Sequence, residues 1–179
     1  MIRRIAIGLV IAATVFLGGS QVVGALSSEG PLILTEAQSQ FISDSCRVSK
    51  IALGEVHSND AVMRVNLGQE YANISSRLMA PLNSRIGLSG RDGVELTRIT
   101  AEYNQLLQQF REAYVVYDDS VSAALAIDCR SKQAEYYGAI MTAREERQEV
   151  RELIDQLNQL AGQYRTEVDE FKQRMEQVE

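Results

Sequence analysis

Few side chains of this chain have the types and spacing that support catalysis. The sequence contains one histidine, His57, and two cysteines, Cys46 and Cys129. A single histidine excludes a di-iron site built from two Glu-x-x-His motifs, and it leaves too few ligands for a zinc site. His57 lies close to Glu55 and Asp60 within a helical stretch, where a histidine is ordinarily a surface or structural residue. We therefore expect no catalytic residue, no metal site and no cofactor, and a protein that is not an enzyme.

The two cysteines fit a structural role better than a redox role. Cys46 and Cys129 have neither CxxC spacing nor a histidine nearby in sequence, which argues against metal binding and thiol exchange. An even pair in an oxidising compartment favours a disulfide. Two buried free thiols are the alternative.

Composition and charge narrow the function further. The chain has 179 residues, of which 45% are hydrophobic and 23% are charged, and its net charge is −6. This hydrophobic share is typical of a folded domain rather than a disordered chain. An acidic chain without a basic cluster is a poor ligand for a phosphate backbone, so we expect no nucleic acid partner.

The N-terminus has the pattern of a targeting segment. Arg3 and Arg4 precede thirteen uncharged residues, 5–17, and a small-residue end at Ala25. This order predicts a secretory signal peptide over 1–25, cleaved after Ala25. The alternative is an uncleaved membrane anchor through residues 5–26, a stretch long enough to span a bilayer. Both interpretations place the rest of the chain outside the cytoplasm, either secreted or periplasmic, or held at the membrane.

A linker over 26–35 precedes a domain that we expect to be helical throughout, over 36–179. Thr35 and Gln38 form a Thr-x-x-Gln capping box, which is typical of a helix start. A glycine-rich break follows near residue 90 and a second break near residue 130. The sequence therefore predicts helices over about 36–87, 93–127 and 132–178.

The breaks between these helices carry their own signals. Gly87 is a residue that closes helices in the left-handed conformation. Asp92 is an N-cap candidate for the second helix, and Ser131 is one for the third. Pro81 is expected to kink the first helix because proline lacks a backbone donor.

Apolar residues recur at alternating steps of three and four along the last two helices. In the second helix this series is Leu96, Ile99, Tyr103, Leu106, Phe110, Ala113, Tyr117, Ser120, Ala124 and Ile127, and a similar series runs from Tyr136 to Val178. Such a seam predicts helices that wind around partners in a left-handed coiled coil. The fold class expected is all-α, an antiparallel up-down-up three-helix bundle or coiled-coil rod.

Short connections set the levels of the helices. Measured from the loop centre near Gly90, Cys46 and Cys129 differ by five residues, or ~7.5 Å of helix rise. The two sulfurs are therefore expected at one level, which independently favours the Cys46–Cys129 disulfide.

Each helix also has one polar residue in its seam: Asp60, Ser120 and Arg147. The same level count places Arg147 within about one turn of Asp60. We hypothesise a buried Asp60–Arg147 pair with Ser120 or His57 close by, because a polar layer fixes helix register. The alternative is that these side chains point outward.

Two surfaces are candidates for contacts with other molecules. Small residues repeat every seven positions along the first helix, at Gly54, Ala61, Gly68 and Ser75. This strip is compatible with a homodimer face or with a tight contact between the first and third helices. The second surface is the exposed tip loop between the first two helices: Leu88, Ser89, Gly90, Arg91 and Asp92.

Two family resemblances arise. Leu34-Thr35-x-x-Gln38 after a leader resembles the LTxxQ motif of the Spy/CpxP periplasmic proteins, which implies an ATP-independent helical chaperone or stress sensor. That family usually has a second copy, and here Leu96-Thr97-Arg98-Ile99-Thr100 has threonine in place of glutamine. Separately, 64–69 together with 78–83 is similar to uncharacterised bacterial envelope or secreted coiled-coil proteins, a resemblance that implies no activity.

The function expected from these features is a non-enzymatic helical scaffold or adaptor outside the cytoplasm. It would bind protein partners in the cell envelope through the tip loop and the exposed sides of the first helix. A Spy/CpxP-like periplasmic chaperone or stress-sensing protein is the alternative, and it would need an exposed concave apolar face.

Overall fold

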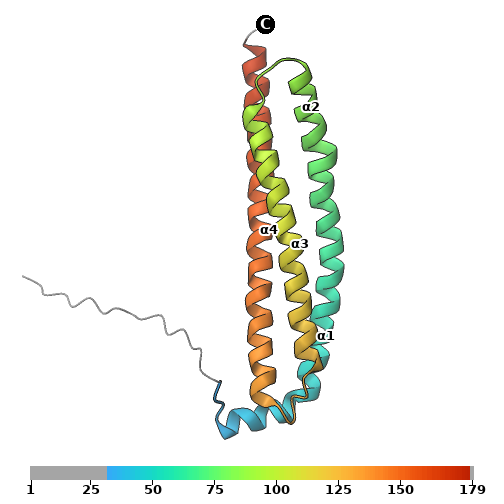
Figure 1. The fold of residues 1–179 in the computed structure, drawn as a ribbon, viewed down its shortest axis with the longest axis vertical. Coiled ribbons are helices and arrows are strands. Elements are labelled where there is room, and N and C mark those ends of the chain that lie inside the picture. The colour runs from blue at the N-terminus through green and yellow to red at the C-terminus, as the bar shows by residue number, and fades with distance from the viewer. Residues whose placement is uncertain (1–31, 178–179) are drawn as a thin grey trace, which may run out of the picture. The chain divides into compact units, whose positions relative to one another are not determined.

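A computed structural model describes residues 32–177, which form helices and no strand. The predicted signal peptide and most of the predicted linker lie outside these residues. The elements are α1 (Glu36–Asn73), the π-helix η1 (Ile74–Met79), α2 (Ala80–Leu88), α3 (Val94–Ala126) and α4 (Gln133–Glu176). α1, η1 and α2 are continuous, so three long helical segments lie side by side (Figure 1). The expected all-helical class and the packing of three helices are confirmed.

The start of α1 is the capping box read from the sequence. The Thr35 backbone N–H donates to Gln38 Oε1 (2.9 Å), and the Gln38 backbone N–H donates to the Thr35 hydroxyl (3.3 Å). The caps of the other two helices differ by one residue from the prediction. Gly93 is the N-cap of α3, with Asp92 accepting from the Val94 N–H at 3.1 Å.

The N-cap of α4 is Lys132 rather than Ser131. The Ser131 hydroxyl instead donates to an Asp128 carboxylate oxygen at 2.7 Å, which ties the loop before α4 to itself. α4 begins at Gln133, one residue later than predicted.

Glycines close the tip between α2 and α3. Gly90, not Gly87 as predicted, is the residue in the left-handed region, with φ of 68°. The N–H groups that follow α2 then bond back to its last turn, from Gly90 to the Gly87 carbonyl and from Arg91 to that of Ile86, which is a Schellman motif. Gly93 permits a close approach, because a Cβ there would lie 2.6 Å from Ile86 Cγ2.

The predicted single helix over 36–87 is interrupted by η1, which ends two residues before Pro81. The Pro81 ring crowds the carbonyl four residues earlier, that of Arg77, and proline donates no hydrogen bond to it. A π-helix is wider than an α-helix and relieves this conflict within the turn. The distortion thus lies before the proline, and the helical segment continues through it without ending.

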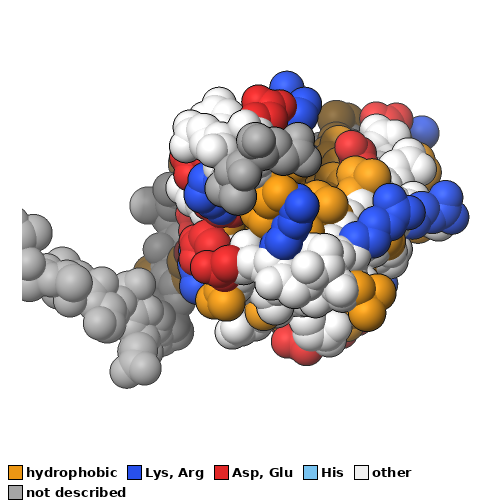
Figure 2. Space-filling view, turned by 90° about the horizontal axis from the view of Figure 1, so that it is seen from above, with side chains coloured by type: hydrophobic (Ala, Val, Ile, Leu, Met, Phe, Trp, Pro, Cys, Tyr) orange, Lys and Arg blue, Asp and Glu red, His pale blue; other side chains and the backbone are white. Residues whose placement is uncertain are grey.

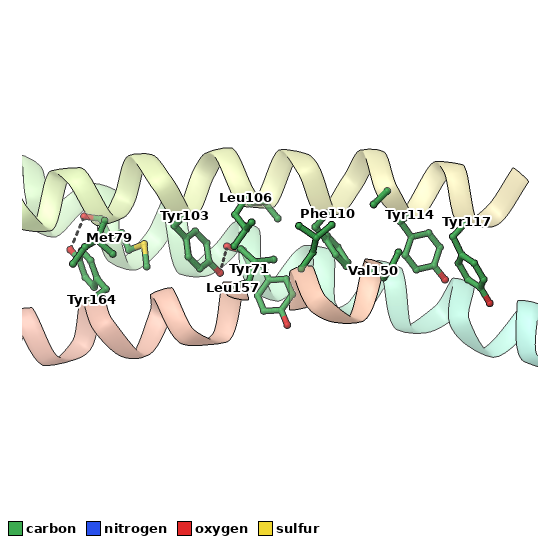
Figure 3. Close-up of a cluster of buried hydrophobic side chains, with 14 of the residues drawn as sticks. Tyr71, Met79, Tyr103, Leu106, Phe110, Tyr114, Tyr117, Val150, Leu157 and Tyr164 are labelled. Atoms are coloured by element: carbon green, nitrogen blue, oxygen red, sulfur yellow. Dashed lines mark hydrogen bonds between the residues drawn. The ribbon is translucent and has the colours of Figure 1, made fainter. Parts of the chain in front are cut away.

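The core lies mainly between α3 and α4 (Figure 3). The α3 series is buried at Leu96, Ile99, Tyr103, Leu106, Phe110, Ala113, Tyr117 and Ala124. Further α3 residues outside that series are also buried: Thr100, Leu107, Tyr114 and Val121. The buried face of α3 is wider than one seam because α3 packs against both other segments.

α1 buries much less of its surface than α3. Only Cys46, Asp60 and Tyr71 of its 38 residues are buried. Its first turns run across the base of the α3–α4 pair, and the helix then turns to run beside α3 (Figure 1). The Ser45 hydroxyl donates to the Phe41 carbonyl in this stretch, a contact that bends helices.

A disulfide joins these first turns of α1 to the loop between α3 and α4. Cys46 and Cys129 are bonded, with their Cα atoms 5.6 Å apart, and both are buried. They form a small core with the buried Tyr136, against which three half-buried residues pack: Ile42, Ile127 and Ile140. The base therefore has an apolar cluster separate from the main core.

In the part of the chain that the structure describes, none of the helices is long and apolar enough to cross a membrane.

We expect reduction of the disulfide to be costly. It closes a span of 83 residues, and a loop of this size stabilises a fold by about 3–5 kcal/mol in the chain-entropy account. Urea unfolding with and without reductant, or of Cys46→Ala/Cys129→Ala, measures this difference in free energy. A loss below about 1 kcal/mol would contradict a structural role for the bond.

Candidate functional site

The main polar cluster inside the bundle combines one residue from each helical segment. Asp60 of α1 has a relative exposure of 7% and accepts two hydrogen bonds from Arg147 of α4, from Nε at 2.7 Å and from Nη2 at 2.9 Å. The Tyr117 hydroxyl of α3 donates to the same carboxylate at 2.6 Å. The structure therefore brings Asp60 and Arg147 together in a two-pronged ion pair.

The titration of these groups follows from burial and pairing. Burial raises the pKa of Asp60, but hydrogen bonds from Arg147 and Tyr117 outweigh it and hold this pKa below its usual value. Burial, followed by the hydrogen bond that Tyr117 donates to Asp60, raises the pKa of Tyr117. Asp60 is thus ionised and Tyr117 protonated at neutral pH, which is the state that the three hydrogen bonds need.

Ser120, which we expected in this layer, lies outside it. Its hydroxyl donates to the Val116 carbonyl of its own helix (2.9 Å), and the side chain is half-buried. After Tyr117 the α3 core continues four residues on, at Val121, rather than three. His57 is also outside the layer, because its Nε2 donates to Asp118 Oδ1 at 2.8 Å.

Tyr114 lies beside the cluster and is one of the buried α3 residues outside the predicted series. Its hydroxyl is buried without a hydrogen-bond partner, and burial raises its pKa to about 12. The Arg64 guanidinium lies 5.1 Å from the centre of its ring. Tyr114, Asp60 and Arg147 line a cavity of about 50 Å3.

Three polar contacts connect α1 to α4 at a constant register. Ser49 bonds Tyr136 (2.8 Å), Asp60 bonds Arg147 and Tyr71 donates to Asn158 (3.3 Å), and each pair is separated by 87 residues. Successive contacts lie eleven residues apart, which is three turns of helix. The sequence predicted the Asp60–Arg147 contact but not the other two, because tyrosine and asparagine have no unique partner.

A second buried cluster ties α2 to α3 and α4 near the tip. Tyr164 donates to Asn83 Oδ1 at 2.8 Å, and Asn83 Nδ2 donates to the Thr100 hydroxyl at 2.8 Å. Tyr164 also reaches the Met79 carbonyl at 3.2 Å (Figure 3). Asn83 was missed because it is a plain polar residue next to a proline-containing turn.

The predicted small-residue strip lies along the side of α1 toward α3. Gly54, Ala61 and Gly68 are half-buried, and Ser75 is buried with its hydroxyl on Asn104 of α3. A Cβ at Gly54 would have no neighbour within 4 Å, and one at Gly68 would only reach Phe110 at 4.0 Å. The strip therefore does not make the tight contact with the third helix that was one of its two interpretations.

The tip is exposed, as the loop composition predicts. Leu88 is the last residue of α2 and has a relative exposure of 86%, while Val94 has 75%. The Arg91 guanidinium contacts Met175 Sδ, so the tip lies beside the end of α4. Seen from above, this end combines hydrophobic side chains with Lys and Arg side chains (Figure 2).

The polar groups of these clusters bond to residues on neighbouring helical segments. Each charged or hydroxyl group of the Asp60 cluster is used by a neighbour, apart from the Tyr114 hydroxyl. Within residues 32–177, no group of three or more His, Cys, Asp or Glu could hold a metal ion.

We expect Asp60→Ala to lower the free energy of unfolding by about 2–4 kcal/mol, because it leaves Arg147 and Tyr117 without their acceptor. Ser120→Ala is the matched control, since its hydroxyl bonds only its own helix, and should change stability by less than about 0.5 kcal/mol. Urea unfolding of the two variants measures both. Equal effects would contradict the assignment of the polar layer.

The ion pair also predicts a pH dependence. Because the pKa of Asp60 is lowered on folding, its contribution is complete above the unfolded-state value of about 3.9 and is lost as pH falls through the folded-state value. The stability gap between the natural protein and Asp60→Asn should therefore narrow below about pH 4. Urea unfolding at a series of pH values tests this, and a gap independent of pH would contradict it.

No protein-family model, no curated protein and no solved structure matches this chain.

Proposed function

We propose that this protein is a non-enzymatic helical scaffold or adaptor that works outside the cytoplasm. The observation that carries the proposal is the exposure of large apolar side chains at the tip and along α1, on a bundle whose interior is filled and cross-linked. Leu88 and Val94 at the tip and Val62 on α1 are all more than 60% exposed. Exposed apolar groups next to charged ones are typical of surfaces that bind proteins.

The proposed architecture is an up-down-up coiled-coil rod behind a leader. It is supported by the order of the contacts between segments. In the contacts between α1 and α4, the residue numbers increase together along both helices, from Ser49–Tyr136 to Tyr71–Asn158. Contacts of the first segment on α3 run in the opposite order, from Asp60–Tyr117 to Asn83–Thr100.

The compartment is proposed on two independent grounds. Residues 1–25 have the composition of a signal peptide, with residues 5–26 as a membrane anchor in the alternative. The Cys46–Cys129 disulfide favours an oxidising space, where such bonds persist. Secreted, periplasmic and membrane-held forms all satisfy both.

A Spy/CpxP-like chaperone or stress sensor is the second candidate, because α1 exposes several large apolar residues. Phe41, Val48, Ile51 and Val65 are each more than half exposed. The LTxxQ-like residues Thr35 and Gln38 form the capping box of α1, a local role that any helix start uses. The motif therefore adds little to this candidate beyond the exposed surface.

We expect a specific partner to contact the tip. A photo-crosslinking residue placed at Leu88 in cells should give a discrete adduct with another protein, whereas one at Val116, which is 48% exposed on α3, should not. Arg91→Glu should weaken the Leu88 adduct, because it reverses a charge at the tip without entering the core.

The scaffold and the chaperone predict different results for crosslinking and for the aggregation of unfolded clients. A scaffold gives one or a few adducts from the tip, and the purified protein leaves the aggregation of unfolded clients unchanged at molar excess. A chaperone suppresses aggregation and gives diffuse adducts from α1. Absence of any adduct from Leu88 would contradict the tip as a contact surface.

A further inference from the structure

The outer face of α1 has a heptad seam of its own, on the side away from α3 and α4. Val48, Ile51, Val62 and Val65 are exposed by 70%, 53%, 62% and 65%. The members of each pair lie three residues apart, and the two pairs lie two heptads apart, as a and d positions do. This seam is distinct from the inner face, where Asp60 and Tyr71 contact the other helices.

The residues beside most of this seam are small or uncharged. On one side they are Ala52, Asn59 and Asn66, and on the other, which borders α3, they are Gly54, Ala61 and Gly68, with the exposed Arg47 beside Val48 as the one charged residue. Flanking positions of a coiled coil are often glutamate or lysine, which form salt bridges between the helices. Small uncharged flanks instead allow another helix backbone to approach closely, and Gly54 has open space above its Cα.

The order of side chains along the seam is self-complementary. We propose that α1 of a second copy of this chain docks on it in the antiparallel direction. The layers are Val48 with the partner's Val65, Ile51 with the partner's Val62, and Glu55 with the partner's Ser58, each formed twice about a two-fold axis. One register thus aligns every apolar residue of the seam with an apolar residue.

Charge selects this direction over the parallel one. Glu55 occupies the seam between the two apolar pairs and is exposed. A parallel dimer would place Glu55 against the partner's Glu55, and facing like charges in a seam are destabilising. The antiparallel dimer places it against a serine hydroxyl, which can donate to the carboxylate.

The length of the seam limits the affinity. From Val48 to Val65 the helix rises ~26 Å, so the buried area falls at the low end for specific interfaces, below about 1,200 Å2. We therefore expect a reversible dimer with a dissociation constant in the micromolar range. The proposal is independent of whether the tip binds another protein.

Sedimentation equilibrium of the purified protein, from low micromolar to several hundred micromolar, tests the interface. Ile51→Lys and Val62→Glu should each shift the protein to monomer, weakening association at least tenfold. The double variant Ile51→Lys/Val62→Glu should regain it, because the antiparallel register places the introduced lysine opposite the introduced glutamate of the partner. A parallel dimer would place like charges together and would not recover.

Val116→Lys is the control, because it puts the same charge on an exposed valine of α3 outside the seam and should leave association unchanged. Far-UV circular dichroism and thermal melting verify that all variants keep the fold. A natural protein that stays monomeric, a dimer that survives Ile51→Lys, or single-variant losses that the double variant does not recover would each overturn the proposal.

Discussion

α1 is held in this bundle by directional contacts more than by continuous apolar packing, and the rest of the structure depends on this. Its inner face has a buried carboxylate, Asp60. A carboxylate in that position must be paired, and Arg147 and Tyr117 pair it at only one rotation and one height of α1. Together with the disulfide at the base, this pair places α1 on the α3–α4 pair.

The constant offset between α1 and α4 extends the same constraint. Ser49, Asp60 and Tyr71 meet their α4 partners every three turns, so the two helices keep one register without a long apolar interface. η1 then changes the register before the Asn83–Tyr164 contact. The π-helical turn therefore helps the first segment to reach both the Asp60 and the Asn83 clusters. It also allows Pro81 to remain inside a continuous helical segment.

Much of this was accessible from sequence because helix rise and period are fixed. The steps of three and four identified most of the α3 core, and counting levels from the tip brought Asp60 near Arg147 and Cys46 near Cys129. Ser120 was misplaced by the same method, since a strict seam drifts on a straight helix and the core moves to Val121. The hydrogen bonds of Tyr117 and Asn83 were missed because they depend on which helix lies opposite. The residue pattern of a single helix does not give that information. Pro81 marked where the first helix is distorted, but the form of the distortion, a π-helical turn before the proline, depends on how the first segment packs.

The position of the tip loop inside the disulfide-closed span has a consequence for proteolysis. Residues 89–93 lie between Cys46 and Cys129, and they are the most exposed connection between two long helices. A protease that cuts there would produce two fragments that remain covalently linked at the base. The nicked molecule would keep its helices together until a reductant released them, so cleavage and disassembly are separate events in this protein.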